Sequence, residues 1–182
     1  LPAEDTFFLA DNLDAREGER VLELGTGCGI LAILAAEAGA DVVATDVNPA
    51  ALRCARENAL AHGVADRIDF RLGDLFEPVR GEKFDLVVFN PPYLPVSSGE
   101  SIGGMLDRAW EGGPDGRGVI DRFLEGLPEH LEEGGRALFV QSSLSDIAKT
   151  LCMLRAFRVN LLRQKLPFEE LFLLRVTTLL AP

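Results

Sequence analysis

The four residues Asn90-Pro91-Pro92-Tyr93 carry the most specific chemistry in the sequence. An amide or exocyclic amine is a poor nucleophile because its lone pair is delocalised into the adjacent π-system. The side-chain carbonyl oxygen of Asn90 and the backbone carbonyl of Pro91 can accept hydrogen bonds from both N–H groups of such an acceptor. These bonds favour a lone pair that is directed at a methyl sulfonium. The motif therefore predicts methyl transfer to a planar nitrogen.

Proline holds these two acceptor oxygens still. Each proline ring fixes its own φ, and each restricts the residue before it. Tyr93 can stack its face on a flat acceptor group. Alignment of nucleophile and methyl group supplies at best about 7–11 kcal/mol, so no metal and no strong general base is required. The alternative is a proline-rich strand exit with a core tyrosine, which the position after the apolar run 84–89 disfavours.

A second set of residues predicts a nucleoside-containing cofactor. Residues 23–29 read ELGTGCG at the end of the first apolar run, where Gly25 and Gly27 let the backbone approach a ligand closely. Asp46 ends the second run, where an acid accepts hydrogen bonds from ribose hydroxyls. Asp74 follows the third run and can accept from an adenine amino group, with Leu75 and its neighbour Phe76 flanking the ring.

Each of these acids has a plainer interpretation. Asp46 could cap the turn before Asn48, and Asp74 could be a turn aspartate after Gly73. An NAD-binding protein uses the same geometry, but its fingerprint is GxGxxG, whereas the glycines here read GxGxG.

The motifs lie at the ends of strands that alternate with helices. The patterns predict strands at 21–24, 41–45, 67–72, 84–89 and 137–141, and helices at 30–38, 48–62, 119–131 and 146–156. Such alternation indicates a parallel sheet covered on both faces. Two final strands, 157–163 and 171–178, have no helix between them and are expected to form an antiparallel hairpin. We expect one α/β domain over residues 1–182, with a seven-stranded, mostly parallel sheet.

Composition narrows the function classes. The 182 residues carry a net charge of −11, which repels nucleic-acid phosphates, although acidity with few lysines could equally be a high-salt adaptation. Apolar runs are short and no leader is visible, so neither a membrane span nor a signal peptide is expected. An odd number of cysteines (Cys28, Cys54 and Cys152, taken as core or near-core) favours a reducing cytoplasm. With two histidines, of which His62 is taken as a helix-end residue, no metal site is predicted.

The order ELGTGCG, ATDVNP, GDLFEP and FNPPY resembles the class I methyltransferases, which have a Rossmann-like fold. More narrowly, the chain resembles the HemK-type release-factor glutamine methyltransferases of the archaeal and eukaryotic branch. Three more specific segments extend this similarity over nearly the whole chain: PAEDT at 2–6, WEGGPDG at 110–116 and LPFEELF at 166–172. The segment 110–116 is either a lid over the acceptor or only the turn that starts the next helix.

The resemblance implies S-adenosyl-L-methionine as cofactor, in contact with Thr6, Glu23, Gly25, Asp46, Asp74, Leu75 and Asn90. It also implies that Asn90 and the Pro91 carbonyl hold the glutamine amide of the Gly-Gly-Gln loop of a class I release factor. Bacterial members have an extra N-terminal helical domain, for which this chain has no room. Archaeal and eukaryotic members instead resemble subunits that work with a small zinc-binding activator protein, so a heterodimer is expected.

Two other functions stay open at this point. A methyltransferase acting on adenine or guanine would use the same Asn90–Tyr93 motif, with Tyr93 stacked on a flipped base, but it needs a basic face that is not visible here. A cofactor-binding scaffold subunit would have no need of the motif. Protein lysine and small molecules are further possible acceptors. In the sheet order that the resemblance implies, strand 67–72 lies at an edge, and we expect the activator to add a strand there. The alternative is that helices cover its apolar residues Ile68, Phe70 and Leu72.

Overall fold

The computed structural model describes residues 3–93 and 115–179. Its elements follow each other as α1 (Glu4–Ala10), β1 (Arg20–Leu24), α2 (Ile30–Glu37), β2 (Asp41–Asp46), α3 (Pro49–Ala61), η1 (Ala65–Arg67), β3 (Ile68–Leu72), η2 (Glu77–Val79), β4 (Phe84–Phe89), α4 (Gly118–His130), β5 (Leu131–Ser142), η4 (Ser143–Ser145), α5 (Ile147–Met153), β6 (Phe157–Lys165) and β7 (Glu170–Thr178). All seven predicted strands and the four predicted helices are present.

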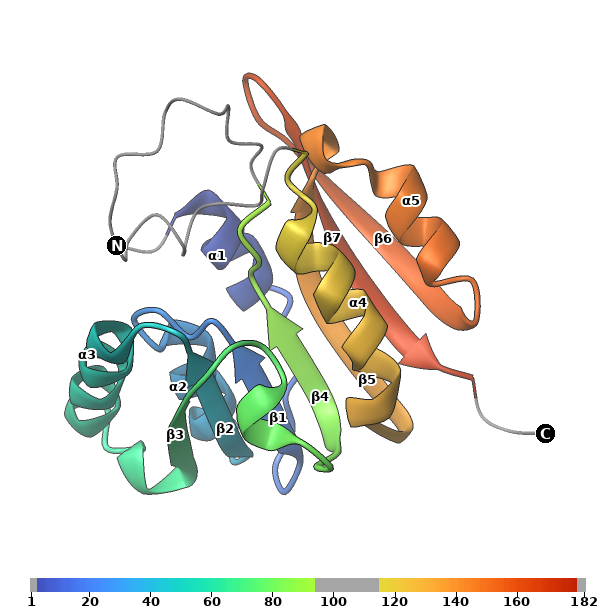
Figure 1. Cartoon of the computed structure of the whole chain (residues 1–182). Coiled ribbons are helices and arrows are strands. Elements are labelled where there is room, and N and C mark those ends of the chain that lie inside the picture. The colour runs from blue at the N-terminus through green and yellow to red at the C-terminus, as the bar shows by residue number, and fades with distance from the viewer. Residues whose placement is uncertain (1–2, 94–114, 180–182) are drawn as a thin grey trace.

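The strands form one sheet in the order β3-β2-β1-β4-β5-β7-β6. The pairs from β3 to β5 are parallel, and β7 is antiparallel to both β5 and β6. The expected parallel sheet with a terminal hairpin, and the edge position of β3, are therefore confirmed. Helices α4 and α5 lie in front of the sheet and α2 lies behind it (Figure 1).

The core explains why the parallel strands are continuous apolar runs. β4 is buried on both faces, with its leucine and valine side chains almost fully inaccessible to solvent. Phe123 of α4 packs in a tilted aromatic pair on Phe89 and edge-on against Phe139 of β5. This packing fixes the end of β4, from which the Asn90–Tyr93 motif emerges.

The largest difference from the sequence prediction is the start of β5, and one short helix was not predicted. Helix α4 ends at His130, and β5 begins at once with Leu131, six residues before the predicted start. The glycines that suggest a loop there bend the strand instead: Gly134 has φ of +77°, and a Cβ on Gly135 would lie 2.8 Å from the Glu132 carbonyl oxygen. Helix α1 was not predicted, because it is seven residues long and has no side-chain cap.

No helix in the described ranges is long and apolar enough to cross a membrane.

Candidate active site

The glycine-rich turn after β1 is built on left-handed backbone. Gly25, Gly27 and Gly29 have φ of +64°, +55° and +85°, which L side chains rarely adopt. A Cβ on Gly29 would also lie 2.9 Å from the Ala55 side chain, so this glycine lets α2 begin close to α3. A Cβ on Gly27 would meet nothing within 4 Å, so this position faces open space. The turn is therefore free to accept a ligand on its Gly27 side.

Asp46 joins the end of β2 to this turn. Its Oδ2 accepts a hydrogen bond from the Gly27 amide at 3.0 Å, and its Oδ1 accepts from the Asn48 amide at 2.8 Å. Asp46 therefore does cap the turn before Asn48, as the plainer interpretation predicts. This role does not exclude ribose binding, because a carboxylate has about four acceptor positions and these bonds use two.

Glu23 lies beneath the turn and is almost fully buried. Its Oε2 accepts from the Thr26 hydroxyl at 2.5 Å and from the Ala32 amide at 3.1 Å, which ties the turn to the first part of α2. Burial raises the pKa of this carboxyl to about 8, against the hydrogen bonds from Thr26 and Ala32, which lower it. Glu23 therefore holds a proton over much of the neutral range.

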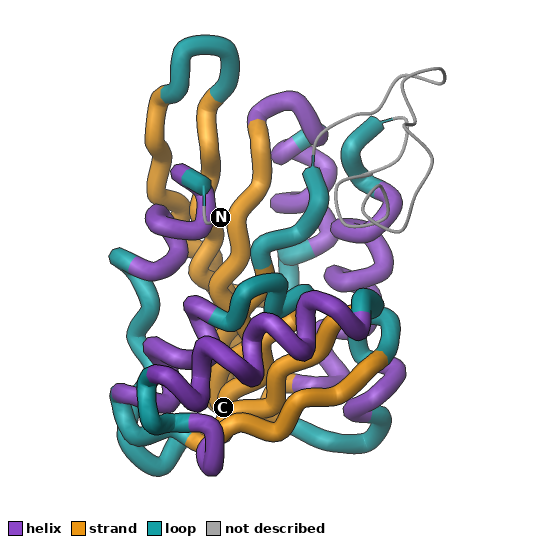
Figure 2. Tube along the Cα trace, turned by 90° about the vertical axis from the view of Figure 1, so that its left-hand side faces the viewer, coloured by secondary structure: helices purple, strands orange, loops and turns teal. Residues whose placement is uncertain are grey.

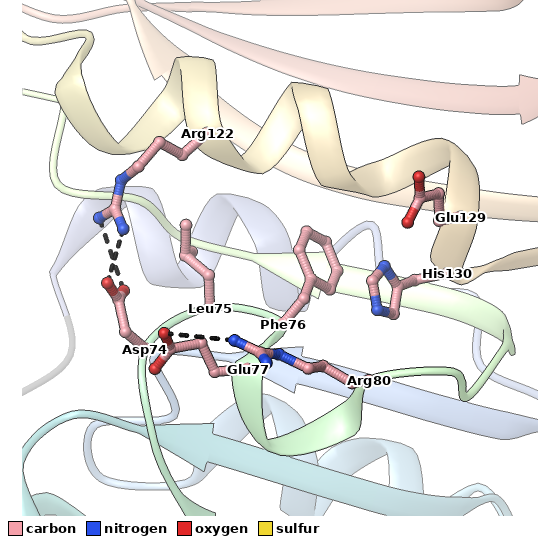
Figure 3. Close-up of a pocket in the computed structure, with 8 residues that line it drawn as sticks. All are labelled: Asp74, Leu75, Phe76, Glu77, Arg80, Arg122, Glu129 and His130. Atoms are coloured by element: carbon pink, nitrogen blue, oxygen red, sulfur yellow. Dashed lines mark hydrogen bonds and ion pairs between the residues drawn. The ribbon is translucent and has the colours of Figure 1, made fainter.

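Asp74 and Leu75 line an open pocket of about 350 Å³ between η2 and α4 (Figure 3). Asp74 forms an ion pair with Arg122 of α4, with Oδ2 and Nη1 2.6 Å apart. Leu75 adopts φ of +46°, which is unusual for a residue with a side chain and marks a constrained position.

Phe76, which the sequence places beside the adenine ring together with Leu75, also lines this pocket (Figure 3). Its ring is buried and stacked 4.2 Å from His130 and 5.9 Å from Phe123. Contact of Leu75 and Phe76 with an adenine ring stays a prediction.

Asn90 follows β4 directly and stands next to the glycine-rich turn. Leu24 pairs with Phe89 across β1 and β4, and a Cβ on Gly25 would lie 3.5 Å from the Phe89 ring. The Asn90 Nδ2 donates to the Thr6 hydroxyl of α1 at 3.2 Å. Its Oδ1 is buried and has no hydrogen-bond partner among the described residues. A buried carbonyl oxygen without a donor is costly, so this atom is suited to an incoming N–H group.

Tyr93 is held differently from the prediction. It is buried, and its hydroxyl donates to Asp5 Oδ2 at 3.0 Å. Burial raises the pKa of the phenol, and the negative charges of Asp5 and Glu169 add to this effect. Stacking of Tyr93 on a flat acceptor therefore needs a surface that the structure largely covers, and the core-tyrosine alternative describes the observed packing better. Pro91 is also buried, and Pro92 is partly exposed.

Two contacts near Tyr93 were not predicted from the sequence. Asp5, in the first turn of α1, accepts the hydrogen bond from the Tyr93 hydroxyl although the two residues are 88 positions apart. Gly116 has φ of +70°, and a Cβ there would lie 2.2 Å from the Tyr93 carbonyl oxygen and 3.1 Å from Ser145 Cβ. Most of the predicted lid segment 110–116 lies outside the described residues. Only its last two residues, Asp115 and Gly116, are described.

The cysteines were only partly predicted. Cys28 is half-buried, but Cys54 and Cys152 are exposed, so they are not core residues. Cys54 lies on the exposed face of α3 and Cys152 on that of α5. The small residues around them do not show from the sequence which face of the helix is exposed. His62 is the C-terminal cap of α3, as predicted, and its Nδ1 lies 3.0 Å from Glu37.

These residues fit S-adenosyl-L-methionine. Four features converge at the carboxyl ends of β1 to β4: a glycine turn with open space, two carboxylates with free acceptor positions, a constrained apolar residue and an orphaned carbonyl oxygen. The glycine turn would let the backbone approach the cofactor, and the two carboxylates would accept from the ribose hydroxyls and the adenine amine. Leu75 would contact the adenine face, and Asn90 Oδ1 would accept a hydrogen bond from the acceptor nitrogen.

Comparison with known proteins identifies the family. Residues 4–102 match the model of the methyltransferase small domain. A putative protein N5-glutamine methyltransferase of Methanocaldococcus jannaschii is 44% identical over 177 residues, covering 95% of this chain and 88% of that protein. Methyltransferase HEMK2 of Homo sapiens is 39% identical over 145 residues, 74% of this chain and 67% of that protein.

Bacterial relatives are longer. A release factor glutamine methyltransferase of Cereibacter sphaeroides is 39% identical over 145 residues, which are 75% of this chain but 51% of that protein. This chain thus spans about half the length of that relative.

Solved structures show the same fold. A ribosomal protein L11 methylase of Lactobacillus delbrueckii has a TM-score of 0.67 at 24% identity and covers 92% of this chain and 74% of its own. An RNA methyltransferase of Salinibacter ruber, in complex with S-adenosyl-L-homocysteine, has a TM-score of 0.63 at 22% identity, covering 100% and 97%. Together with the relatives above, this shows that the chain belongs to the HemK-type glutamine methyltransferases, a family of class I S-adenosyl-L-methionine-dependent enzymes.

Proposed function

We propose that this protein transfers a methyl group from S-adenosyl-L-methionine to the side-chain amide nitrogen (N5) of the glutamine in the Gly-Gly-Gln loop of a class I release factor. The observation that carries the proposal is the buried Oδ1 of Asn90 at the end of β4, which has no hydrogen-bond partner in the described part of the chain. The names of the relatives from Methanocaldococcus jannaschii and Cereibacter sphaeroides support glutamine as the acceptor, and the latter supports a release factor as the substrate.

The orientation of the Asn90 amide follows from Thr6. Because Nδ2 donates to the Thr6 hydroxyl, the opposite side of the amide presents Oδ1 to the acceptor. Oδ1 and the Pro91 carbonyl accept the two N–H groups of the glutamine amide, which favours a lone pair directed away from both oxygens. The bound cofactor supplies an electrophilic methyl group on a sulfonium. Alignment of the nitrogen with that methyl group is the main contribution of the chain to catalysis.

Tyr93 does not act as the base in this scheme. Its hydroxyl donates to Asp5, and its pKa is raised by burial and by nearby carboxylates, so it stays protonated. Its role is to hold the Asn90–Tyr93 turn against α1. After methyl transfer the amide nitrogen carries a positive charge and an acidic proton, which passes to water without a dedicated protein base.

The test is methyl transfer from labelled S-adenosyl-L-methionine to a purified class I release factor, with the methylated residue identified by mass spectrometry. The control is the same factor with its Gly-Gly-Gln glutamine replaced by alanine. We expect label on the wild-type factor only. Label on nucleic acid in a cell lysate, removed by nuclease but not by protease, would contradict the proposal.

The proposal includes a heterodimer with a small zinc-binding activator that adds a strand to β3. β3 is an edge strand, and its Leu72 is 59% exposed. The rest of the strand is better protected than predicted: Ile68 is buried, and Arg56 lies 5.0 Å above the Phe70 ring. Arg71 is paired with Asp69 and Glu82. The free backbone and Leu72 therefore remain as the contact surface.

Hydrogen exchange of residues 67–72 with and without the activator tests this interface. Added protection of these amides supports strand addition. A complex that forms without added protection there would place the interface elsewhere. A cytoplasmic location also belongs to the proposal, because the three cysteines are free thiols.

A further inference from the structure

The turn between β6 and β7 carries the most exposed large apolar side chain among the described residues. Phe168 is 94% exposed. Because β7 starts beside Ser142 at the carboxyl end of β5, this turn lies at the same edge of the sheet as Asn90. Figures 1 and 2 show it projecting beyond the neighbouring strands. A single exposed apolar residue is common on protein surfaces, so its surroundings decide what it means.

The β6–β7 turn is joined to η4 by side-chain hydrogen bonds. The Ser142 hydroxyl donates to the Glu169 carboxylate, and the Glu170 amide donates to the Ser143 hydroxyl at 3.1 Å. Ser142 Oγ also accepts from the Leu144 amide at 3.1 Å, and the Leu144 side chain is 53% exposed. Two exposed apolar side chains, Leu144 and Phe168, therefore stand on linked turns.

Buried polar groups hold η4 rigidly from beneath. The guanidinium of Arg117 is almost fully buried and donates to the carbonyl oxygens of Ser145 and Asp146, each at 2.7 Å. Gln141 Nε2 donates to the same Ser145 carbonyl at 2.5 Å. Apolar side chains on a rigid support lose little conformational entropy when they bind a partner.

Both η4 and the β6–β7 turn lie near the methyl-acceptor motif Asn90–Tyr93. Gly116 lies between Ser145 of η4 and the Tyr93 carbonyl, and even a Cβ on this glycine would lie within 3.1 Å of both. The charge of Glu169 acts on the Tyr93 hydroxyl together with that of Asp5. The rim beside Tyr93 thus combines apolar side chains with two carboxylates, which suits a protein surface with apolar and basic residues and repels a phosphate backbone.

We infer that Phe168, Leu144 and Glu169 form an acceptor lip that binds the folded surface of the protein substrate next to its methyl-accepting loop, with Phe168 as the anchor. This inference rests on the proposed function, because it assigns a docking surface to the same substrate. Exposed aromatic side chains on a rigid support are typical of residues that dominate binding. The lip contributes affinity for the substrate and takes no part in the chemical step.

The test compares steady-state methylation of a full-length class I release factor by wild-type enzyme and by Phe168→Ser, with the activator present in both. We expect KM for the release factor to rise by about 10- to 100-fold, as for loss of a dominant aromatic contact, while kcat and the affinity for S-adenosyl-L-homocysteine are unchanged. Phe168→Leu should recover most of the loss. A matched control is Leu60→Ser. Leu60 is 64% exposed on α3, which contacts β2 and β3 at the edge of the sheet farthest from β6 and β7. This variant should leave KM unchanged.

Three outcomes would overturn the lip. KM equal to that of wild type is the first. A fall in kcat at constant KM is the second, because it indicates a structural effect on the site. The third is a concentration-dependent dimer of the wild-type protein that Phe168→Ser abolishes, since the occupant would then be a second copy of this chain.

Failure of the proposed function looks different. In that case the wild-type enzyme does not methylate the release factor at all. The variant is then compared with wild type on the proteins of a cell lysate, where weaker labelling of the same protein by Phe168→Ser still supports the lip. Label on nucleic acid alone would overturn both inferences.

Discussion

The cofactor side and the acceptor side of the site are assembled in different ways. On the cofactor side, Glu23 and Asp46 are satisfied close to their own strand ends: Glu23 binds Thr26 and Ala32, and Asp46 binds Gly27 and Asn48. Asp74 is the exception, because it pairs with Arg122 of α4. The acceptor side depends on contacts across the chain.

There, α1 reaches the motif at Asn90 and Tyr93 over separations of 84 and 88 residues. Within residues 3–93 and 115–179, one oxygen of this side, Asn90 Oδ1, has no hydrogen-bond partner. The cofactor side is thus complete before a ligand arrives, whereas the acceptor side keeps an unmet hydrogen bond for its substrate. Substitutions on the two sides should therefore separate cofactor affinity from turnover.

The largest effect is expected for Asn90→Ala. Loss of the acceptor-orienting oxygen should reduce kcat by about 10²–10³-fold, in line with the loss of one preorganised hydrogen bond in a catalytic site. The dissociation constant of S-adenosyl-L-methionine, measured by calorimetry, should change by less than about tenfold, because orientation of the acceptor is what is lost. Near-normal turnover would refute the role assigned to Oδ1.

Asp46→Ala should do the opposite. The variant loses acceptors for the Gly27 and Asn48 amides as well as for a ribose, and removal of a charged partner costs about 1–3 kcal/mol. We expect cofactor affinity to fall by about 10- to 100-fold, with kcat at saturating cofactor nearly unchanged. The same calorimetric titration checks this, and unchanged affinity would leave Asp46 with only its turn-capping role.

Thr6→Ala tests whether α1 orients the acceptor side. Without its hydroxyl, the Asn90 amide loses the bond that fixes which face presents Oδ1. Turnover should fall by about tenfold, close to the value of one hydrogen bond. Thr6→Ser keeps the hydroxyl and is the matched control. Equal loss of activity in both variants would point to packing of α1 instead.

Glu23→Gln should affect turnover least and show itself in stability against pH. The folded-state pKa of Glu23 is about 8, above its usual 4.5, so the folded protein retains a proton that the unfolded chain releases. The stability from this group is complete below pH 4.5 and is lost as pH rises toward 8, at up to about 1.4 kcal/mol per pH unit. Urea unfolding between pH 5 and 8 should show a smaller decline for the variant than for wild type. An equal decline would mean that Glu23 is already ionised.

The cofactor side could be predicted from the sequence because its signals are local. The Gly25 turn, Asp46 and Asp74 each lie within a few residues of an apolar run, and strand order places them together. The acceptor motif was also found from its own residues. What the sequence did not show are partners distant along the chain, such as Asp5 for Tyr93 and Arg117 for η4, since neither has a periodic pattern.

The burial of Phe76 and Tyr93 was also not predicted, because it too depends on residues distant along the chain. An aromatic residue beside a binding motif suggests ligand contact, yet both rings are buried within the protein. The choice depends on α4 and α1, which supply Phe123, His130 and Asp5 as partners. Burial of an aromatic ring is a tertiary property and is not encoded in its neighbours along the chain.

The contact of Gly116 with the Tyr93 carbonyl has a consequence for how this enzyme can be altered. The described residues Tyr93 and Gly116 are therefore neighbours in space, although many positions separate them along the chain. In general, a flexible connection of about twenty residues between two neighbouring points costs only about 1.4 kcal/mol more in chain entropy than one of four. Segments of very different length can therefore be exchanged at this junction with little strain on the sheet, provided position 116 stays glycine. The fold thus offers an insertion site beside the acceptor motif at which new substrate specificity can be grafted.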